Sequence, residues 1–445
     1  MDSGTIQDIS KSNKLKTEFN IDTLQFKTFK YFWDLGKNKH YQIPDRYPQK
    51  TFYSISATGF GLAAYIIGIE RKYITRDEGT ERVLNTLISI KNLVQNDSIT
   101  ASGYKGFFYH FLDLKEAKRY KKVELSSVDT GLLLAGILLA QSYFDSNVEK
   151  EKRIRSLADE IYRKVDWTWM YDKEKNLLSM GWKPETGFLK HYWQGYNEAL
   201  FLYILALGSP THSIPEESYD NWLKTYSWKE FMGYKMINFS PLFGHQFSQA
   251  FIDFRGIGDK FVEKHNIDYF ENSKRATLSQ IKYAENNPNK FKGYSKNLWG
   301  FTACDGPNDT IVFDQKIYFY KYRARGVSAS EIVDDGTIAP YASGASLPFT
   351  PTESYKTMEK IWETYNDKII GEYGFKDAFN LSYTYGKGNE EGWYDNDYIG
   401  IDQGILLMQI ENYRTELIWK ILKKNKYVIS GLKKAKFKGG WLKKL

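Results

Sequence analysis

Carboxylic acids recur in this sequence where a polar loop runs into an apolar helical segment. Asp129 lies in Leu125-Ser-Ser-Val-Asp-Thr-Gly-Leu-Leu-Leu-Ala135, and Glu198 lies in Trp193-Gln-Gly-Tyr-Asn-Glu-Ala-Leu200. Burial raises a carboxyl pKa, and two carboxyl groups in different surroundings can act as general acid and base, as in glycoside hydrolysis. Each residue can equally be a first-turn acid that only stabilises the start of a helix.

Three more aspartates follow the same pattern. Asp305 lies in a loop, Asp335 lies in Val333-Asp-Asp-Gly-Thr337, and Asp402 precedes the last long helical segment. Alone, each reads as a turn or cap residue. Their recurrence at loop-to-helix boundaries is what a site at the mouth of a helical barrel would produce.

Two further polar groups stand in otherwise apolar strings. Asp253 and Arg255, in Phe251-Ile-Asp-Phe-Arg-Gly256, are interpreted as a structural ion pair. His245 and Gln246 could bind sugar hydroxyls, although an isolated histidine is more often part of the scaffold.

The sequence argues against several other kinds of site. Cys304 is the single cysteine, so an intrachain disulfide and a cysteine-based zinc site are excluded. The six histidines form no H-E-x-x-H pair, and no G-x-S-x-G elbow, Walker A loop or dinucleotide fingerprint is present. We expect no metal and no other cofactor.

Composition favours a sugar or nucleic-acid ligand only slightly. Aromatic residues make up 17% of the 445 residues, and their faces stack on sugars and bases as well as filling cores. The net charge is +8, but much of the excess lies in lysines between 420 and 444. We interpret residues 433–445 as a solvated basic tail and expect no nucleic-acid partner.

The chain has no run of about 18 apolar residues, so we expect no transmembrane helix. The first 20 residues are polar and contain no apolar signal-peptide core. This pattern fits a cytoplasmic protein or one whose leader has been removed. We treat residues 1–20 as an N-terminal tail.

The elements that must position these acids are helices. Apolar residues at helical spacing predict helices over 24–35, 54–69, 75–94, 126–144, 154–170, 196–207, 247–254, 269–284, 352–365 and 403–422. Thr75 and Glu78 have the spacing of a capping box, and the small residues of 54–69 indicate close helix packing.

We predict an all-α fold, a single domain over residues 21–432 built as an α/α barrel of helical hairpins. Aromatic and glycine-rich loops separate the helices, and one or two short strands are expected between 305 and 339. An elongated α-solenoid is the alternative, but no fixed-period repeat supports it.

At these residues the chain resembles the bacterial glycoamylase-like family, which includes endo-β-1,2-glucanases of glycoside hydrolase family 144 and domains of cyclic β-1,2-glucan synthases. The matching strings are collinear from about Phe26 to about Gly431. They include Glu124-Leu-Ser-Ser-Val-Asp-Thr, Gly195-Tyr-Asn-Glu-Ala, Pro241-Leu-Phe-Gly-His-Gln, Thr302-Ala-Cys-Asp-Gly-Pro, Asp335-Gly-Thr-Ile-Ala-Pro and Asp402-Gln-Gly.

The resemblance implies a six-hairpin α/α toroid that hydrolyses a neutral glucan, β-1,2-glucan, in endo fashion and with inversion. It implies Glu198 as general acid and Asp129 as the residue that positions substrate or water, although these roles could be reversed. Asp305, Asp335 and Asp402 are expected to bind sugar or relay protons. The other expected substrate-binding residues are Tyr109, His110, Trp182, Trp193, Tyr196, His245, Gln246 and Trp299.

The resemblance also implies a periplasmic or secreted monomer with an oligo- or polysaccharide substrate. Three other functions stay open: a glucoamylase-type α-glucan hydrolase, a polysaccharide lyase and a non-catalytic glycan-binding protein. A lyase needs an acidic polymer and a basic cleft, whereas the carboxyl-rich loops favour a neutral substrate. The two candidate acids argue against a protein that only binds glycans.

Overall fold

The structure, a computed structural model, describes residues 18–312 and 317–444. Its helices are α1 (Ile21–Leu35), α2 (Ile55–Glu70), α3 (Arg76–Asn92), α4 (Ser127–Tyr143), α5 (Glu149–Arg163), α6 (Trp167–Met170), α7 (Ala199–Gly208), α8 (Glu217–Leu223), α9 (Phe243–Phe251), α10 (Lys260–Lys264), α11 (Tyr269–Asn286), α12 (Pro340–Ala345), α13 (Pro351–Ile369), α14 (Gly400–Thr415), α15 (Leu417–Leu422), α16 (Lys426–Lys434) and the 3-10 helix η2 (Gly440–Lys444).

The strands are short and lie between the helices. They are β1 (Arg46–Tyr47), β2 (Tyr53–Ser54), β3 (Gly103–Tyr104), β4 (Phe107–Tyr109), β5 (Phe111–Leu112), β6 (Leu125–Ser126), β7 (Tyr171–Asp172), β8 (Leu177–Leu178), β9 (Gly181–Lys183), β10 (Gly187–Phe188), β11 (Trp228–Phe231), β12 (Tyr234–Ile237), β13 (Ile257–Gly258), β14 (Ala303–Cys304), β15 (Thr310–Val312), β16 (Ile317–Phe319), β17 (Arg323–Ala324), β18 (Gly326–Val327), β19 (Ile332–Val333), β20 (Thr337–Ile338), β21 (Ile370–Gly371), β22 (Gly374–Phe375), β23 (Phe379–Asn380), β24 (Trp393–Tyr394), β25 (Tyr398–Ile399) and β26 (Lys438–Gly439).

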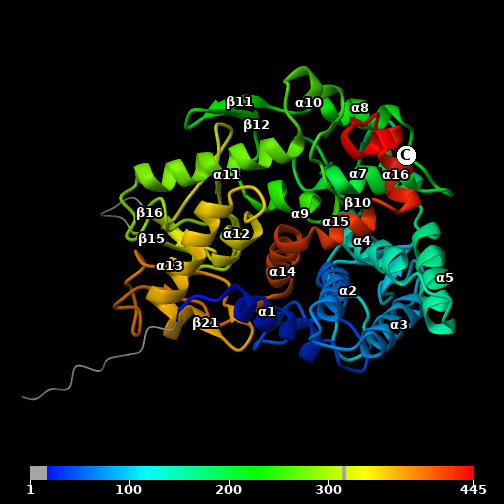
Figure 1. Ribbon diagram of the computed structural model, residues 1–445, viewed down its shortest axis with the longest axis horizontal. Helices are drawn as coiled ribbons and strands as arrows, with labels where there is room; N and C mark the ends of the chain where they lie inside the picture. The colour runs from blue at the N-terminus through cyan, green and yellow to red at the C-terminus, as the bar shows by residue number, and fades with distance from the viewer. Residues whose placement is uncertain (1–17, 313–316, 445) are drawn as a thin grey trace, which may run out of the picture.

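Six largely buried helices follow one another around a closed circuit. Helix α2 packs on α4, α4 on α7, α7 on α9, α12 on α14, and α14 on both α9 and α2. The Gln246 side chain of α9 donates a hydrogen bond to the carbonyl of Ala342 in α12, which links these two neighbours. Figure 1 places α14 near the middle of the molecule, beside α2 and α9. The predicted mostly helical architecture is therefore confirmed.

Three of these helices, α2, α4 and α7, can lie inside because their sequences are apolar on nearly every side. All residues of α7 are buried, as are nearly all of α2 and α4. The predicted close packing is seen between α2 and α4, where a Cβ atom on Gly136 would lie 2.2 Å from the carbonyl oxygen of Gly59. A helix that is apolar all round is stable only when other elements cover it.

Amphipathic helices cover this circuit from outside. Helix α3 packs on α2, α5 on α4, α11 on α9, α13 on α12, and α1 on α14. The predicted capping box at the start of α3 is confirmed, because Thr75 and Glu78 each bond the backbone amide of the other. In chain order α1, α3, α11 and α13 precede α2, α4, α12 and α14, so each of these buried helices begins after a loop that returns from an outer helix.

Those returning loops contain far more strands than the sequence indicated. A five-stranded antiparallel sheet runs in the order β10-β9-β6-β4-β3, and many two-stranded pairs accompany it. The expectation of one or two short strands between 305 and 339 was too low. Two-residue strands leave too few positions for an alternating pattern to be recognised, and their partners are distant in sequence.

Several helix boundaries also differ from the prediction. The segment 154–170 is divided into α5 and α6, and 403–422 is divided into α14 and α15 at Glu416, which has a left-handed backbone with φ 61°. The short helices α8, α10, α12 and α16 were not predicted. Their apolar stripes are too short for a periodicity to stand out.

The basic C-terminal segment is packed against the protein rather than solvated. Strand β26 pairs with β13, Phe437 is buried, and the indole of Trp441 donates a hydrogen bond to the carbonyl of Asp253. Lys436 forms an ion pair with Asp220 at 2.8 Å. Alternating lysines therefore conceal an apolar face that the charge count alone does not reveal.

At the other end, the predicted tail over residues 1–20 falls mainly outside the described residues. Within the described part, Phe19 is buried against Trp362, and the Asn20 side chain accepts the amide of Thr23 to begin α1. Within 18–312 and 317–444, no helix combines the length and apolar character that crossing a bilayer requires.

The contact between α2 and α4 makes a testable prediction about stability. Gly136→Ala should lower the free energy of unfolding by about 1–3 kcal/mol, because the new methyl group meets backbone that cannot rotate away. Urea denaturation measures this loss. Gly79→Ala, in α3, is the matched control, since its methyl group meets mainly the end of the Ile69 side chain. An equal loss in both variants would contradict the role of the close contact.

Candidate active site

The starts of α4 and α7 bring the two main candidate acids together. Asp129 lies in the first turn of α4, where its amide bonds the Oγ of Ser126, and that hydroxyl donates to Oδ2 of Asp129 at 2.5 Å. Glu198 immediately precedes α7, and its carbonyl accepts a hydrogen bond from Ser248. The negative charge of Asp129 is close enough to contribute to the raised pKa of Glu198.

Glu198 has the surroundings of a general acid. Its Oε2 atom is buried and has no hydrogen-bond partner in the part of the chain that the structure describes. Burial, and to a lesser degree the charge of Asp129, raises the pKa of this carboxyl group to about 7. A carboxylic acid that keeps its proton near neutral pH can protonate a leaving oxygen.

His110 joins Asp129 to a further acid. Its Nε2 atom lies 3.5 Å from Oδ1 of Asp129, and its Nδ1 atom lies 2.9 Å from Oε1 of Glu124. Burial opposes a charge on this ring, but the two carboxylates outweigh it and raise the pKa of His110 to about 9. The imidazolium in turn outweighs burial at Glu124 and lowers the pKa of that group to about 2. His110 is thus a cation held between two anions.

A second group of acids surrounds Arg46 on β1. The Arg46 guanidinium lies 2.8 Å from Asp305, 3.3 Å from Asp397 and 3.3 Å from Asp45. The amide of Asp305 donates to Asp377 at 2.7 Å. A single guanidinium therefore faces three carboxylates.

Beside Asp305, the buried Asp377 and Asp402 lie close enough for each to affect the pKa of the other. Burial and the neighbouring negative charges raise the pKa of Asp377 well above its usual range, and burial raises that of Asp402 to about 8. Burial, with Asp377 and Asp305 nearby, also raises the pKa of Asp395 to about 8. Protons are therefore retained among these acids at neutral pH.

One cluster of three carboxylates bears on the prediction that the protein binds no metal. Carboxylate oxygens of Asp305, Asp377 and Asp395 lie within 4.8 Å of one another. The retained protons and the Arg46 guanidinium already reduce the repulsion among them. We assign no ion to this cluster.

Asp335 does not join either group. Its carboxylate is 0% exposed, and both oxygens accept hydrogen bonds from the Arg325 guanidinium at 2.7 and 2.8 Å. The amides of Tyr320 and Thr337 bond the same carboxylate. The expected sugar-binding role is therefore corrected to a structural one, as a buried ion pair that holds the loop.

Five other predicted substrate-binding residues are buried supports rather than exposed contacts. They are Tyr109, Tyr196, His245, Gln246 and Trp299, none more than 1% exposed. His245 bonds the carbonyl of Phe239, and burial lowers its pKa to about 4, so it is neutral. Tyr196 packs in parallel with Tyr269 behind the start of α7. The His245 ring and the Gln246 amide bond backbone carbonyls, whereas Tyr109 Oη and Trp299 Nε1 have no hydrogen-bond partner among the described residues.

The two remaining tryptophans differ from each other. Trp193 is buried and its indole donates to Ser127 at 2.8 Å, so it ties the segment before Glu198 to the start of α4. Trp182 is partly exposed on β9. The predicted Asp253–Arg255 ion pair is confirmed at 2.7 Å, with Lys423 as a second partner.

The chain resembles known proteins both in sequence and in fold. The sequence profile of the Glycoamylase family, described as "Putative glucoamylase", matches residues 190–426. The chain belongs to the Glycoamylase family. A glucoamylase-like protein from Bacteroides uniformis is 31% identical, with a TM-score of 0.82 over 96% of this chain and 100% of that one.

Two further Glycoamylase relatives have more specific descriptions. An endo-β-1,2-glucanase from Chitinophaga pinensis, in complex with sophorotriose and glucose, is 29% identical with a TM-score of 0.81 over 95% of this chain and 98% of that one. An exo β-1,2-glucooligosaccharide sophorohydrolase from Parabacteroides distasonis is 28% identical over 93% of this chain. The chain spans 57% of the length of that relative.

Sequence reasoning missed several residues of this Glycoamylase site, namely Asp45, Arg46, Glu124, Asp377, Asp395 and Asp397. No helical or strand periodicity marks them. Arg46 reaches Asp397 because β1 pairs with β25 across about 350 residues of sequence. The dense acidic string Asp395-Asn-Asp397, ahead of Asp402, was the one local signal available.

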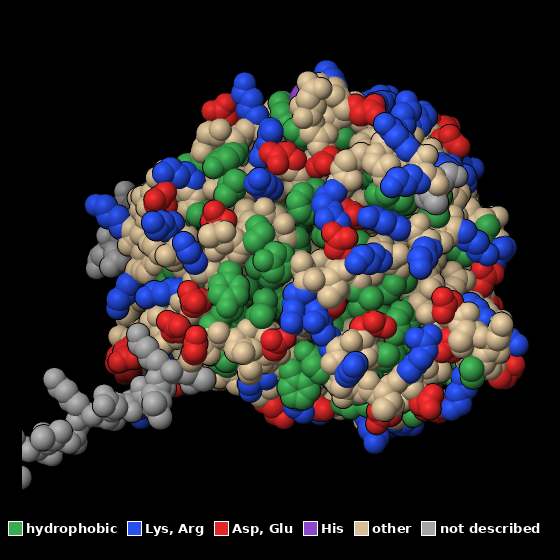
Figure 2. Space-filling view, in the orientation of Figure 1, with side chains coloured by type: hydrophobic (Ala, Val, Ile, Leu, Met, Phe, Trp, Pro, Cys, Tyr) green, Lys and Arg blue, Asp and Glu red, His purple; other side chains and the backbone are tan. Residues whose placement is uncertain are grey.

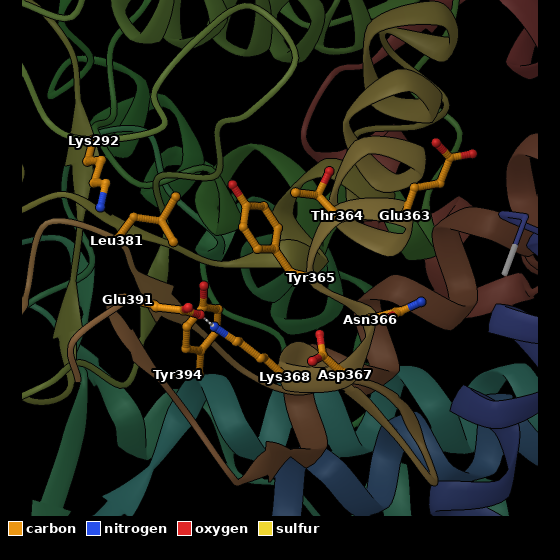
Figure 3. Close-up of a pocket in the computed structure, with 10 residues that line it drawn as sticks. All are labelled: Lys292, Glu363, Thr364, Tyr365, Asn366, Asp367, Lys368, Leu381, Glu391 and Tyr394. Atoms are coloured by element: carbon orange, nitrogen blue, oxygen red, sulfur yellow. Dashed lines mark hydrogen bonds and ion pairs between the residues drawn. The ribbon is translucent and has the colours of Figure 1, made fainter. Parts of the chain in front are cut away.

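A cavity of about 460 Å³ has none of the predicted site residues in its lining (Figure 3). Tyr365, Leu381 and Tyr394 line it, and an ion pair between Lys368 and Glu391 closes one side. Tyr394 is the last residue of β24, and Asp395 follows it outside the strand. We assign this cavity no part in the site.

The raised pKa of Glu198 predicts a pH-dependent stability. Between its ordinary value of 4.5 and about 7, the folded protein holds a proton that the unfolded chain releases. The contribution of Glu198 to stability therefore falls as pH rises through this window. The free energy of unfolding of Glu198→Gln, taken relative to that of the parent, should therefore rise by about 1–3 kcal/mol from pH 5 to pH 8.

Urea denaturation of both proteins at the two pH values checks this difference. Glu216→Gln is the matched control, because Glu216 also precedes a helix, α8, and makes no side-chain capping bond. The control should show no such pH dependence. A Glu198→Gln difference that stays constant with pH would mean that the carboxyl group ionises normally.

Proposed function

We propose that this chain is a glycosidase that hydrolyses β-1,2-glucan by carboxyl catalysis on an α/α toroid. The observation that carries the proposal is the pairing of Glu198, whose pKa is raised to about 7, with Asp129 at the starts of adjacent buried helices. The circuit α2-α4-α7-α9-α12-α14, covered by outer helices, supports the toroid. The two relatives that act on β-1,2-linked glucans support the substrate.

In this proposal Glu198 protonates the leaving glycosidic oxygen. Asp129 is held as an acceptor by Ser126 and the His110 cation, so it positions a sugar hydroxyl or the attacking water. An ionised carboxylate among the acids around Arg46 takes up the proton that water loses. The raised pKa values of Asp377 and Asp402 show that acids in this group bind protons tightly. This division gives an inverting reaction with separate acid and base groups.

The surroundings favour a neutral substrate. Carboxyl groups dominate the site, and its two cations, Arg46 and His110, are already paired with acids. An acidic polymer would be repelled by this arrangement, which disfavours the lyase alternative. The periplasmic or secreted location also stays a proposal, supported by the family resemblance.

A chromatographic product assay tests the substrate. The protein is incubated separately with linear β-1,2-glucan, soluble starch and an acidic polysaccharide. We expect short β-1,2-linked products of several lengths from the first and no change in the other two. Sophorose alone would show exo rather than endo cleavage, and glucose from starch would replace the proposal with an α-glucan hydrolase.

A single substitution tests the general acid. Glu198→Gln should fold normally and reduce kcat on β-1,2-glucan by at least about 100-fold, since the amide cannot donate the proton. Circular dichroism establishes folding, and Glu216→Gln should retain parental turnover. Parental turnover in Glu198→Gln would assign the acid to another residue.

A further inference from the structure

Four aromatic rings gather over one face of the five-stranded sheet, two of them from its edge strands β3 and β10, and we call them the edge aromatics: Tyr104, Trp169, Trp182 and Phe188. The ring centre of Trp169 lies 5.4 Å from Trp182 and 4.9 Å from Phe188. Tyr104 lies 5.6 Å from Trp182. Phe188 is 42% exposed, which is unusual for a phenylalanine with aromatic neighbours available to cover it.

The edge aromatics face away from the catalytic acids. Trp182 lies opposite Leu125 on β6 and opposite Phe188 on β10, so these three side chains share one face of the sheet. Successive side chains of a strand point to opposite faces. Glu124 and Ser126, on either side of Leu125, therefore point to the other face, where they bond His110 and Asp129. Trp182 is thus corrected from a wall of the catalytic site to a member of a separate surface.

A cavity of about 310 Å³ adjoins the edge aromatics. Trp169 and Phe188 line it together with Asp172, Ser179 and Tyr192. The Tyr192 hydroxyl donates to Asp172 at 2.7 Å, and the amides of Glu174 and Lys175 bond the same carboxylate. The amide of Lys175 and the Tyr192 hydroxyl lower the pKa of Asp172, so a fixed anion lies beside the rings.

We propose that the edge aromatics and this cavity form an accessory binding site for a neutral glucan chain, separate from the catalytic acids. Sugar rings have apolar C–H faces that stack on aromatic rings and hydroxyl edges that need hydrogen-bond partners. Phe188 and Trp169 supply aromatic faces for stacking, and Asp172 and Tyr192 supply hydrogen-bond partners for the sugar hydroxyls. The volume is at the lower end of small-molecule sites, about 300–1,000 Å³, which suits one or two sugar units.

The choice of glucan as ligand rests on the proposed function. A site on the opposite face of the sheet would hold one part of a glucan polymer while another part of the same glucan is bound at the catalytic acids. Two linked contacts raise the affinity for a long chain without changing that for a short one. The accessory site therefore distinguishes polymer from short oligosaccharide.

Affinity electrophoresis through gels that contain linear β-1,2-glucan tests the site. The experiment uses Glu198→Gln protein, so that the polymer stays intact, with and without Phe188→Ala. We expect Phe188→Ala to weaken polymer binding roughly three- to tenfold, from the loss of one stacking ring. In otherwise parental protein, Phe188→Ala should leave kcat/KM for a β-1,2-linked trisaccharide unchanged.

Phe26→Ala is the matched control, because Phe26 is also 42% exposed but lies on α1 beside Tyr73. Equal retardation of the Phe188 and Phe26 variants overturns the accessory site, as does loss of trisaccharide turnover in Phe188→Ala. Starch and an acidic polysaccharide are run in parallel gels. Binding through Phe188 to starch, without hydrolysis of β-1,2-glucan, retains the accessory site and overturns the proposed function.

Discussion

The arrangement of acids at this site depends on the Arg46 guanidinium and the protons that the neighbouring acids retain. Six aspartates approach one another around Arg46, which bonds three of them, Asp45, Asp305 and Asp397, directly. Each additional buried anion costs free energy unless a positive charge or a proton compensates it. Arg46 supplies one positive charge, and the raised pKa values of Asp377, Asp395 and Asp402 indicate that retained protons neutralise three more of these acids.

The same principle separates the properties of Asp129 and Glu198. Both lie where the dipole of a helix N-terminus favours a negative charge, by about 0.3–1 kcal/mol. Asp129 also has a serine hydroxyl and the His110 cation as partners. Among the described residues, Glu198 makes no capping bond and has one buried oxygen without a partner, so burial outweighs the dipole. The surroundings of Glu198 thereby raise its pKa to about 7, as the role of general acid requires.

The sequence identified the acids that adjoin long helices, because an apolar helix gives a clear periodic signal. Asp129, Glu198 and Asp402 were found in this way. Arg46 was not, because β1 and β25 are two residues long and pair across about 350 residues of sequence. Asp377 was not, because it lies in the loop between the two-residue strands β22 and β23. Burial was the other source of error: Asp335 and His245 stand in motif-like strings, but their partners, Arg325 and the carbonyl of Phe239, are close only after folding.

The sheet β10-β9-β6-β4-β3 explains how an aromatic-rich chain can support both a core and a surface for ligands. One face of β6 leads through Ser126 to Asp129, and the other carries Leu125 opposite Trp182. Acidic and basic side chains are interspersed over the face that Figure 2 shows, so this face carries no broad patch of one sign. Recognition of a neutral chain then depends on ring faces and hydrogen bonds at fixed positions. A two-faced sheet provides such positions because the alternation that directs Ser126 toward the acids necessarily directs Trp182 and Phe188 away from them.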